Sequence, residues 1–374
     1  MADRFRYLDH ATSAAPPTVV AHALARDASS ATMLGSAGQR RRSERVEDAR
    51  VTCAGLLGVA VDDVSFVRNT TAGLALVANG MDWTPGDRVV VADRDHPLTI
   101  GAWSSLAALG VEVDVAAGHE ESWSVPLDAF RQLLENGGGR VRAVVVSWVN
   151  YARGGRHDLA ALASLAHQHG ALLVADVIQG LGVIPCDVRA WGVDAAVGGG
   201  QKWLLGPEGV GLLATTPELR ERLRLREPGR RSMAEQDHRF SFDPTRDRTG
   251  RRFEGGSRNR GGIAGLGAST DLLAGVGIDA VWAHVDQWCD RLVAGLSDLG
   301  ATVVSDRSPA GRSPIVTATF GDADPTAIVE KLVTRGVLAA PRGGGVRFSP
   351  HAWNDDDDLA FTLEALGRAW RRNG

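Results

Sequence analysis

Cysteines, long apolar runs and excess positive charge are all scarce in this sequence of 374 residues, and each scarcity excludes a class of protein. The three cysteines, Cys53, Cys186 and Cys289, lack both the short spacings of metal sites and the density of disulfide-rich secreted domains. No run approaches the roughly 20 apolar residues that cross a bilayer. The net charge of −4 argues against a dedicated nucleic-acid binder. We therefore expect a cytoplasmic protein with no membrane segment, no nucleic-acid partner and no metal.

Short apolar runs alternate with amphipathic segments between Val64 and Thr215. The predicted strands are 88–92, 111–115, 142–148, 171–176, 195–198 and 209–215. Continuous apolar strands separated by helices indicate a mostly parallel sheet that helices cover on both faces. The fold class is therefore α/β, and ligands of such sheets bind beyond the carboxyl ends of the strands.

The composition changes near residues 220–260, which are rich in Arg, Gly, Asp and Ser and poor in periodic apolar residues. We interpret this stretch as a long excursion that links two domains. Helix-like and strand-like segments resume after Gly261 and favour a smaller α+β domain. The predicted division is an N-terminal arm that joins the small domain (1–20), a large domain (21–255) and the small domain (256–374).

Lys202 lies in a glycine-rich loop directly after an apolar run. A lysine confined in such a place loses its proton more easily and becomes a nucleophile; a surface lysine is the alternative. The loop is not a phosphate-binding P-loop, because Trp203 follows the lysine where Ser or Thr is required. The dinucleotide-binding glycine fingerprint is also absent.

Three further features accompany Lys202. Thr70-Thr71 opens a predicted helix, where free backbone N–H groups attract anions; an ordinary helix cap is the alternative. His96 follows one predicted strand, and Asp176 ends another. A phosphate site, an aromatic base, a carboxylate and a lysine, in this order, suit pyridoxal phosphate (PLP), whose pyridine nitrogen needs an acid and whose aldehyde needs a lysine.

At this point the chain resembles the class V aminotransferase family of fold-type I PLP enzymes. Cysteine desulfurases, isopenicillin N epimerase and C–S lyases belong to that family. The resemblance runs from Tyr7-Leu-Asp-His-Ala-Thr-Ser13 to Arg347-Phe-Ser-Pro-His351, nearly the whole chain. It implies a large domain with a mostly parallel sheet and a smaller α+β domain.

The resemblance also implies roles around the cofactor. Lys202 would bond covalently to the aldehyde, and Asp176 would pair with the pyridinium nitrogen. Gln179 would hydrogen-bond the phenolic oxygen. His96 would stack on the ring and move protons, and Thr70-Thr71 would bind the phosphate.

Other residues would serve the substrate and the partner subunit. Arg347 matches the arginine that binds the substrate carboxylate with two hydrogen bonds; a surface arginine on an edge strand is the alternative. The family's asparagine near that carboxylate falls at Asn150 or Tyr151. Ser257 lies in a segment that reaches the phosphate of the neighbouring subunit, which implies a homodimer with shared sites.

The chain departs from the family at two places. Relatives often carry Ser-x-His before the lysine, where this chain has Gly199, Gly200 and Gln201. Cysteine desulfurases need a cysteine in the segment that corresponds to residues 336–345, and this chain has none there. We therefore expect C–S bond cleavage by β-elimination on a cysteine-derived amino acid, without a persulfide cysteine. Transfer of the amino group to a keto acid, epimerisation and a catalytically silent scaffold are the alternatives.

Overall fold

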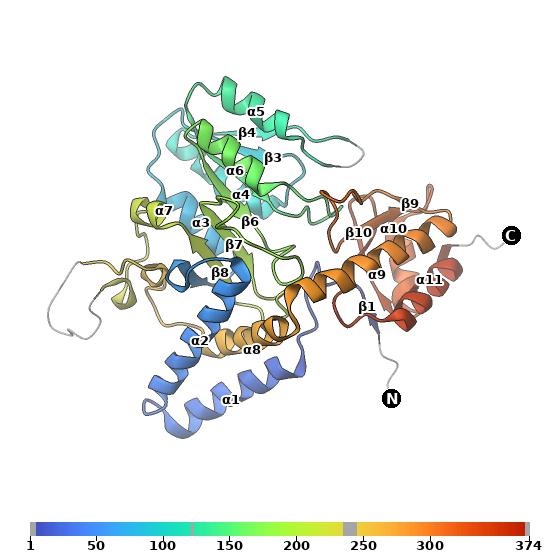
Figure 1. The fold of residues 1–374 in the computed structure, drawn as a ribbon, viewed down its shortest axis with the longest axis horizontal. Coiled ribbons are helices and arrows are strands. Elements are labelled where there is room, and N and C mark those ends of the chain that lie inside the picture. Colours follow the sequence, from blue (N-terminus) through green and yellow to red (C-terminus); the bar gives the residue numbers. More distant parts are fainter. Residues whose placement is uncertain (1–4, 121–122, 235–244, 371–374) are drawn as a thin grey trace.

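The computed structural model describes residues 5–120, 123–234 and 245–370 (Figure 1). Its centre is a seven-stranded sheet in the order β2-β8-β7-β6-β5-β3-β4. The strands are β2 (Val64–Val67), β3 (Arg88–Ala92), β4 (Glu112–Ala116), β5 (Val141–Ser147), β6 (Leu172–Asp176), β7 (Ala195–Gly199) and β8 (Gly211–Thr215). β8 runs in the opposite direction to the other six strands of this sheet. The expected mostly parallel sheet is confirmed, and the predicted strand ends agree within two residues.

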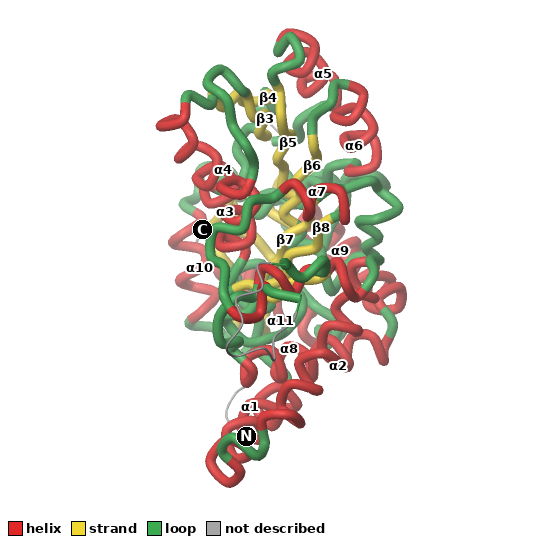
Figure 2. Tube along the Cα trace, turned by 90° about the vertical axis from the view of Figure 1, so that its left-hand side faces the viewer, coloured by secondary structure: helices red, strands yellow, loops and turns green. Residues whose placement is uncertain are grey.

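Helices cover both faces of this sheet, as Figure 2 shows. Along β3, Val89 and Val91 pack with α3 (Thr70–Gly80) and α4 (Pro97–Ser104), whereas Val90 faces the opposite core. The opposite core is covered by α2 (Gln39–Leu57), α5 (Leu127–Asn136) and α6 (Leu159–Gln168). The strands are apolar throughout because both of their faces are buried.

A second, smaller sheet follows late in the chain. It contains β12 (Ala340–Arg342), β13 (Gly345–Phe348), β10 (Val316–Thr319) and β9 (Thr302–Val303) in that order, all antiparallel. The accompanying helices are α9 (Ile278–Asp298), α10 (Pro325–Val333) and α11 (Asp356–Trp370). The N-terminal arm joins this region through β1 (Arg6–Tyr7), which pairs in parallel with β11 (Val337–Leu338).

The two regions meet at a bend between α8 (Arg260–Val276) and α9, whose axes differ by 79°. Gly277 forms the bend with a φ of 86°, a conformation that favours glycine. Although α8 follows residue 255, it packs against α1 (Thr18–Leu34) and α2, beside the large sheet (Figure 1). The division at residues 20 and 255 stays a prediction.

The predicted excursion at 220–260 follows α7 (Pro217–Arg222), and its residues 235–244 lie outside the described part. Within the described ranges, no single helix is long and apolar enough to cross a membrane. The α8–α9 pair meets those criteria only when both helices are counted together across their bend.

Candidate active site

The predicted site residues of the large region lie at the carboxyl ends of the parallel strands. Asp176 ends β6, Lys202 follows β7, and His96 follows β3. Thr70 begins α3 directly after β2, which runs in the same direction as these strands. Parallel strands bring the residues that follow them to one edge of the sheet, which is where such sheets bind ligands.

A compact turn holds Lys202. The Gly200 N–H donates to the Val210 carbonyl at 2.8 Å, and the Gly206 N–H donates to the Gly200 carbonyl at 2.8 Å. A Cβ on Gly199 would overlap Gln201 Oε1 and lie 2.9 Å from Ile178 Cδ1, so a serine there would require both side chains to move. Glycine at this position leaves room for the side chains of Gln201 and Ile178.

Lys202 and Asp176 are both pushed toward their neutral forms. Burial lowers the pKa of Lys202 to about 8; Asp176 opposes that shift and Arg347 adds to it. Burial raises the pKa of Asp176 to about 7. A buried amine and a buried acid that titrate near neutrality are typical of functional sites.

Asp176 has two protein partners, and one of them was not predicted. Its Oδ1 accepts from the Ile178 N–H at 2.9 Å, and its Oδ2 accepts from the Thr99 hydroxyl at 3.4 Å. Neither partner is charged, so the carboxylate is available for a cationic ring nitrogen. Sequence reasoning missed Thr99 because only the fold brings α4 beside the end of β6.

His96 caps α4. Its Nδ1 accepts from the Leu98 N–H at 3.2 Å, and its ring lies edge-on to Tyr151 at 4.7 Å between centroids. The preceding Asp95 fixes the backbone by accepting from the N–H groups of His96 and Ser147 at 2.6 and 2.7 Å. Burial, followed by the charge of Lys202, lowers the pKa of His96. His96 and Lys202 therefore share one site.

The first turn of α3 contains a threonine hydroxyl that makes no hydrogen bond. Asn69 caps the helix through the Ala72 N–H at 2.9 Å, while the buried Thr70 Oγ1 has no hydrogen-bond partner. A Cβ on Gly73 would overlap Val197 Cγ1, so this glycine allows α3 to lie close to β7. A buried donor beside free helix N–H groups fits a phosphate. Thr71 is exposed on the same turn.

Gln179 connects the N-terminal arm to the lysine turn. Its Nε2 donates to the Ala11 carbonyl at 3.0 Å, and its Oε1 accepts from Trp203 Nε1 at 2.9 Å. These bonds place the buried amide beside Lys202, with one N–H of the amide group remaining. Its predicted bond to the phenolic oxygen stays a prediction.

Arg347 is buried, and a carboxylate of this chain already occupies part of its fork. Its Nη2 donates to Asp9 Oδ1 at 2.8 Å and to Thr12 Oγ1 at 2.6 Å, and its Nη1 donates to the Tyr151 carbonyl at 2.7 Å. Its buried Nε has no partner. The alternative of a surface arginine is wrong, because the side chain is 1% exposed.

Asn150 has a structural task in this arrangement. Its Oδ1 accepts from the N–H groups of Ala152 and Arg153, and its Nδ2 donates to the Arg94 carbonyl at 3.1 Å. It therefore shapes the turn that presents the Tyr151 carbonyl to Arg347. The substrate roles of Asn150 and Tyr151 stay predictions.

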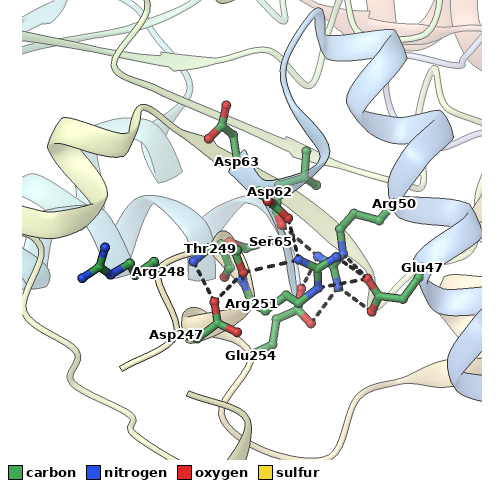
Figure 3. Close-up of polar contacts among 12 residues, drawn as sticks. Glu47, Arg50, Asp62, Asp63, Ser65, Asp247, Arg248, Thr249, Arg251 and Glu254 are labelled. Atoms are coloured by element: carbon green, nitrogen blue, oxygen red, sulfur yellow. Dashed lines mark hydrogen bonds and ion pairs between the residues drawn. The ribbon is translucent and has the colours of Figure 1, made fainter. Parts of the chain in front are cut away.

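Ser257 lies on the surface, away from the contacts that join Lys202, Asp176, His96 and Arg347. It lines a cavity of about 580 Å³ together with Ala72 of α3. An ion network fastens the segment before it: Glu254 bonds Arg50 at 2.6 Å, and Glu47 bonds Arg50 and Arg251 (Figure 3).

The cysteines and the possible metal ligands are the remaining candidate reactive groups. Burial raises the pKa of Cys53 and Cys289 to about 12 and also raises that of Cys186. They lie in α2, in α9 and in the segment between β6 and β7. Among the described residues, no cluster of His, Cys, Asp and Glu could hold a metal ion.

A family model of class-V aminotransferases matches residues 6–345. The chain belongs to this family. A cysteine desulfurase of Klebsiella pneumoniae is 33% identical over 74% of this chain and 68% of its own. A probable cysteine desulfurase of Methanothermobacter thermautotrophicus is 28% identical over 87% and 84%. An uncharacterized aminotransferase of Bacillus subtilis, YcbU, is 26% identical over 86% and 83%.

Solved structures share the fold. The apo cysteine desulfurase of Thermococcus onnurineus NA1 has a TM-score of 0.87 at 21% identity and covers 98% of this chain and 95% of its own. The cystine C–S lyase C-DES in complex with cysteine persulfide has a TM-score of 0.88 at 22% identity, over 98% of both chains. These likenesses confirm the fold-type I architecture.

Pyridoxal phosphate is the cofactor of this family member. The residues at the sheet edge fit it on three observations. The buried Thr70 hydroxyl makes no hydrogen bond, Asp176 lacks a charged hydrogen-bond partner, and burial lowers the pKa of Lys202. These residues would hold the phosphate, the ring nitrogen and the aldehyde, respectively.

Proposed function

We propose that the protein cleaves the C–S bond of a cysteine-derived amino acid by β-elimination, without a persulfide cysteine. The observation that carries the proposal is that the segment 336–345 near Arg347 contains no thiol. Burial also lowers the pKa of the Lys202 amine to about 8, which suits it to act as a base. The names of the relatives, cysteine desulfurase and cystine C–S lyase, support a cysteine-type substrate.

Two residues of the chain would bind and deprotonate the substrate. Arg347 would bind the α-carboxylate, which either shares the guanidinium with Asp9 or displaces that carboxylate. Lys202 Nζ would take the proton from Cα as a general base, a task that suits an amine whose pKa is near the working pH. When bound, PLP supplies an electron sink for the carbon that loses this proton.

The electron pair left at Cα would form a double bond to Cβ as the C–S bond breaks. Sulfur leaves with the bonding electrons and takes a proton, for which Lys202 and His96 are the nearby carriers. Addition of water to the remaining three-carbon unit gives pyruvate and ammonia. The balance is one amino acid and one water converted to pyruvate, ammonia and a thiol.

The state of the cysteines supports a reaction without a protein persulfide. The thiolate is the nucleophile in sulfur transfer. Cys53 and Cys289 are fully buried, and burial raises the pKa of each to about 12. Cys186 is half-buried, and burial raises its pKa as well, so all three thiols favour the protonated form at neutral pH.

Transfer of the amino group to a keto acid is the second candidate, supported by the likeness to YcbU. Epimerisation at Cα requires the same first step and differs only in where the proton returns.

One experiment separates these reactions. The PLP-loaded protein is given a cysteine S-conjugate with no keto acid, and pyruvate and ammonia are measured. We expect both in equal amounts with one thiol per pyruvate. Product that forms only when a keto acid is present would identify an aminotransferase, and an inverted amino acid without pyruvate would identify an epimerase.

The proposed assembly is a homodimer in which Ser257 reaches the phosphate of the partner subunit. The exposed position of Ser257 and the cavity that it shares with α3 support this arrangement. Light scattering should give twice the mass of one chain; a monomeric mass at enzyme-assay concentrations contradicts it. The cytoplasm is the proposed compartment, supported by three thiols that form no disulfide.

A further inference from the structure

A second arginine stands on the same face of the small sheet as Arg347. In the antiparallel pair β12–β13, Ala340 lies opposite Arg347 and Arg342 lies opposite Gly345. Residues opposite each other, and residues two apart on one strand, project to the same side of a sheet. Arg342 is therefore the diagonal neighbour of Arg347, and the Cα atoms of such neighbours lie roughly 7–8 Å apart.

The turn of this hairpin is held against the active site. Gly343 and Gly344 form it with φ values of 61° and 81°. Arg153 Nε donates to the Gly343 carbonyl at 2.9 Å, which ties the turn to the loop that carries Tyr151. The ring of Tyr151 packs against His96. Arg342 is thereby placed close enough for its charge to lower the pKa of both His96 and Arg347.

In the part of the chain that the structure describes, Arg342 has no opposite charge beside it, in contrast to Arg347. Arg347 is paired with Asp9 at 2.8 Å, and burial draws Lys202 toward its neutral form. Among the described residues, no carboxylate lies within ion-pair distance of Arg342, whose printed hydrogen bond goes to the Pro341 carbonyl. The Arg342 side chain is exposed, so a ligand can reach it.

We propose that Arg342 binds an anionic group at the far end of the substrate side chain, so that the preferred substrates are cysteine S-conjugates whose sulfur substituent ends in a carboxylate or a similar acid. This inference rests on the proposed function of the site. Because both side chains project from the same side of the hairpin, a substrate with its α-carboxylate on Arg347 would direct a second acid a few bonds beyond sulfur toward Arg342. The planar guanidinium of arginine suits a carboxylate.

A matched pair of compounds tests the assignment. S-carboxymethylcysteine and S-carbamidomethylcysteine have the same shape and differ in one negative charge. Their dissociation constants are measured by titrating the visible absorbance of the PLP-loaded protein, which requires no knowledge of the reaction. We expect the acid to bind about fivefold to tenfold more tightly than the amide, with a smaller difference at high salt.

Substitution of Arg342 should remove this preference. In Arg342→Ala the ratio of the two dissociation constants should fall to about one, because only the acid loses affinity, and Arg342→Lys should restore part of it. Arg335→Ala is the control, since Arg335 is another exposed arginine that bonds a local carbonyl, that of Lys331. Its ratio should equal that of the wild type.

Three results would overturn the inference. They are equal binding of the two compounds by the wild type, failure of the acid to bind, and equal weakening of both compounds in Arg342→Ala, which would instead assign Arg342 to the α-carboxylate. Pyruvate release is measured separately. If no pyruvate forms from either compound while the preference in binding is present and depends on Arg342, the proposed elimination fails and this inference stands.

Discussion

Two groups of buried charges in this protein differ in how their charges are satisfied. Around Arg50 every charge has an opposite partner: Glu254 at 2.6 Å and Glu47 at 2.9 Å (Figure 3). These contacts lower the pKa of Glu47 to about 2 and raise that of Arg50. Around Lys202 the pKa shifts have the opposite directions. The pKa of Lys202 falls and that of Asp176 rises, so both groups are shifted toward their uncharged forms.

This difference distinguishes a structural charge cluster from a functional one. A buried pair with complete partners holds its charges and fixes the position of the chain, as Arg50 and Glu254 do for the segment before Ser257. A buried charge without an opposite partner gives up its charge, and its hydrogen-bonding capacity remains for a ligand. Substitutions in the two groups should therefore affect different properties.

The largest expected effect is on catalysis. Lys202→Ala should reduce the turnover of a cysteine S-conjugate by roughly 10²–10⁴-fold, because it removes the proposed general base. Chemical denaturation of the cofactor-free protein should show unchanged or slightly higher stability, since a desolvated amine is lost. A large loss of stability with full turnover per folded molecule would place Lys202 in the structural group.

The next effect is on stability. Arg50→Met should lower the free energy of unfolding by about 3–5 kcal/mol, because Glu254 stays buried without its partner. The matched control is Arg40→Met, which breaks an exposed pair with Glu44 and should cost less than about 1 kcal/mol. Urea denaturation measures both, and equal losses would contradict the distinction.

The third effect depends on pH. Burial raises the pKa of Asp176 from 3.8 to about 7, so the native state holds a proton that the unfolded state has lost. This contribution to stability is complete below pH 3.8 and disappears as the pH rises to 7. Cofactor-free Asp176→Asn should therefore gain stability over wild type between pH 5 and pH 8, up to roughly 4 kcal/mol. A difference that is independent of pH contradicts the shift.

The smallest effect concerns the phosphate. Thr70→Val removes a hydroxyl with no partner in the protein and should raise the dissociation constant of PLP about tenfold, with little change in the stability of the cofactor-free protein. Thr32→Val, on the exposed side of α1, is the control and should leave that constant unchanged. Tight PLP binding by Thr70→Val would exclude this hydroxyl from the phosphate site.

Local sequence patterns, namely apolar runs and the polar residues that follow them, predict much of the site. Continuous apolar strands indicate the parallel sheet. Asp176 ends such a strand, and Lys202 and His96 follow others within a few residues, so their common edge follows from topology. The reversed direction of β8 was not predictable, because an apolar strand reads the same in either direction.

Contacts across the chain were beyond prediction. Asp9 and Arg347 are 338 residues apart, and no local pattern indicates that the arm supplies the carboxylate for that arginine. Thr99 approaches Asp176 only through the packing of α4. The placement of α8 beside α1 and α2 depends on tertiary contacts that a change in composition near residue 255 does not reveal.

Reduction with borohydride followed by peptide mass spectrometry tests the central claim most directly. The reagent fixes PLP to the amine that holds it, and the chain has two lysines, Lys202 and Lys331. Our account predicts one phosphopyridoxyl group per chain on the Lys202 peptide. A label on Lys331, or no label on a protein that binds PLP, would contradict it.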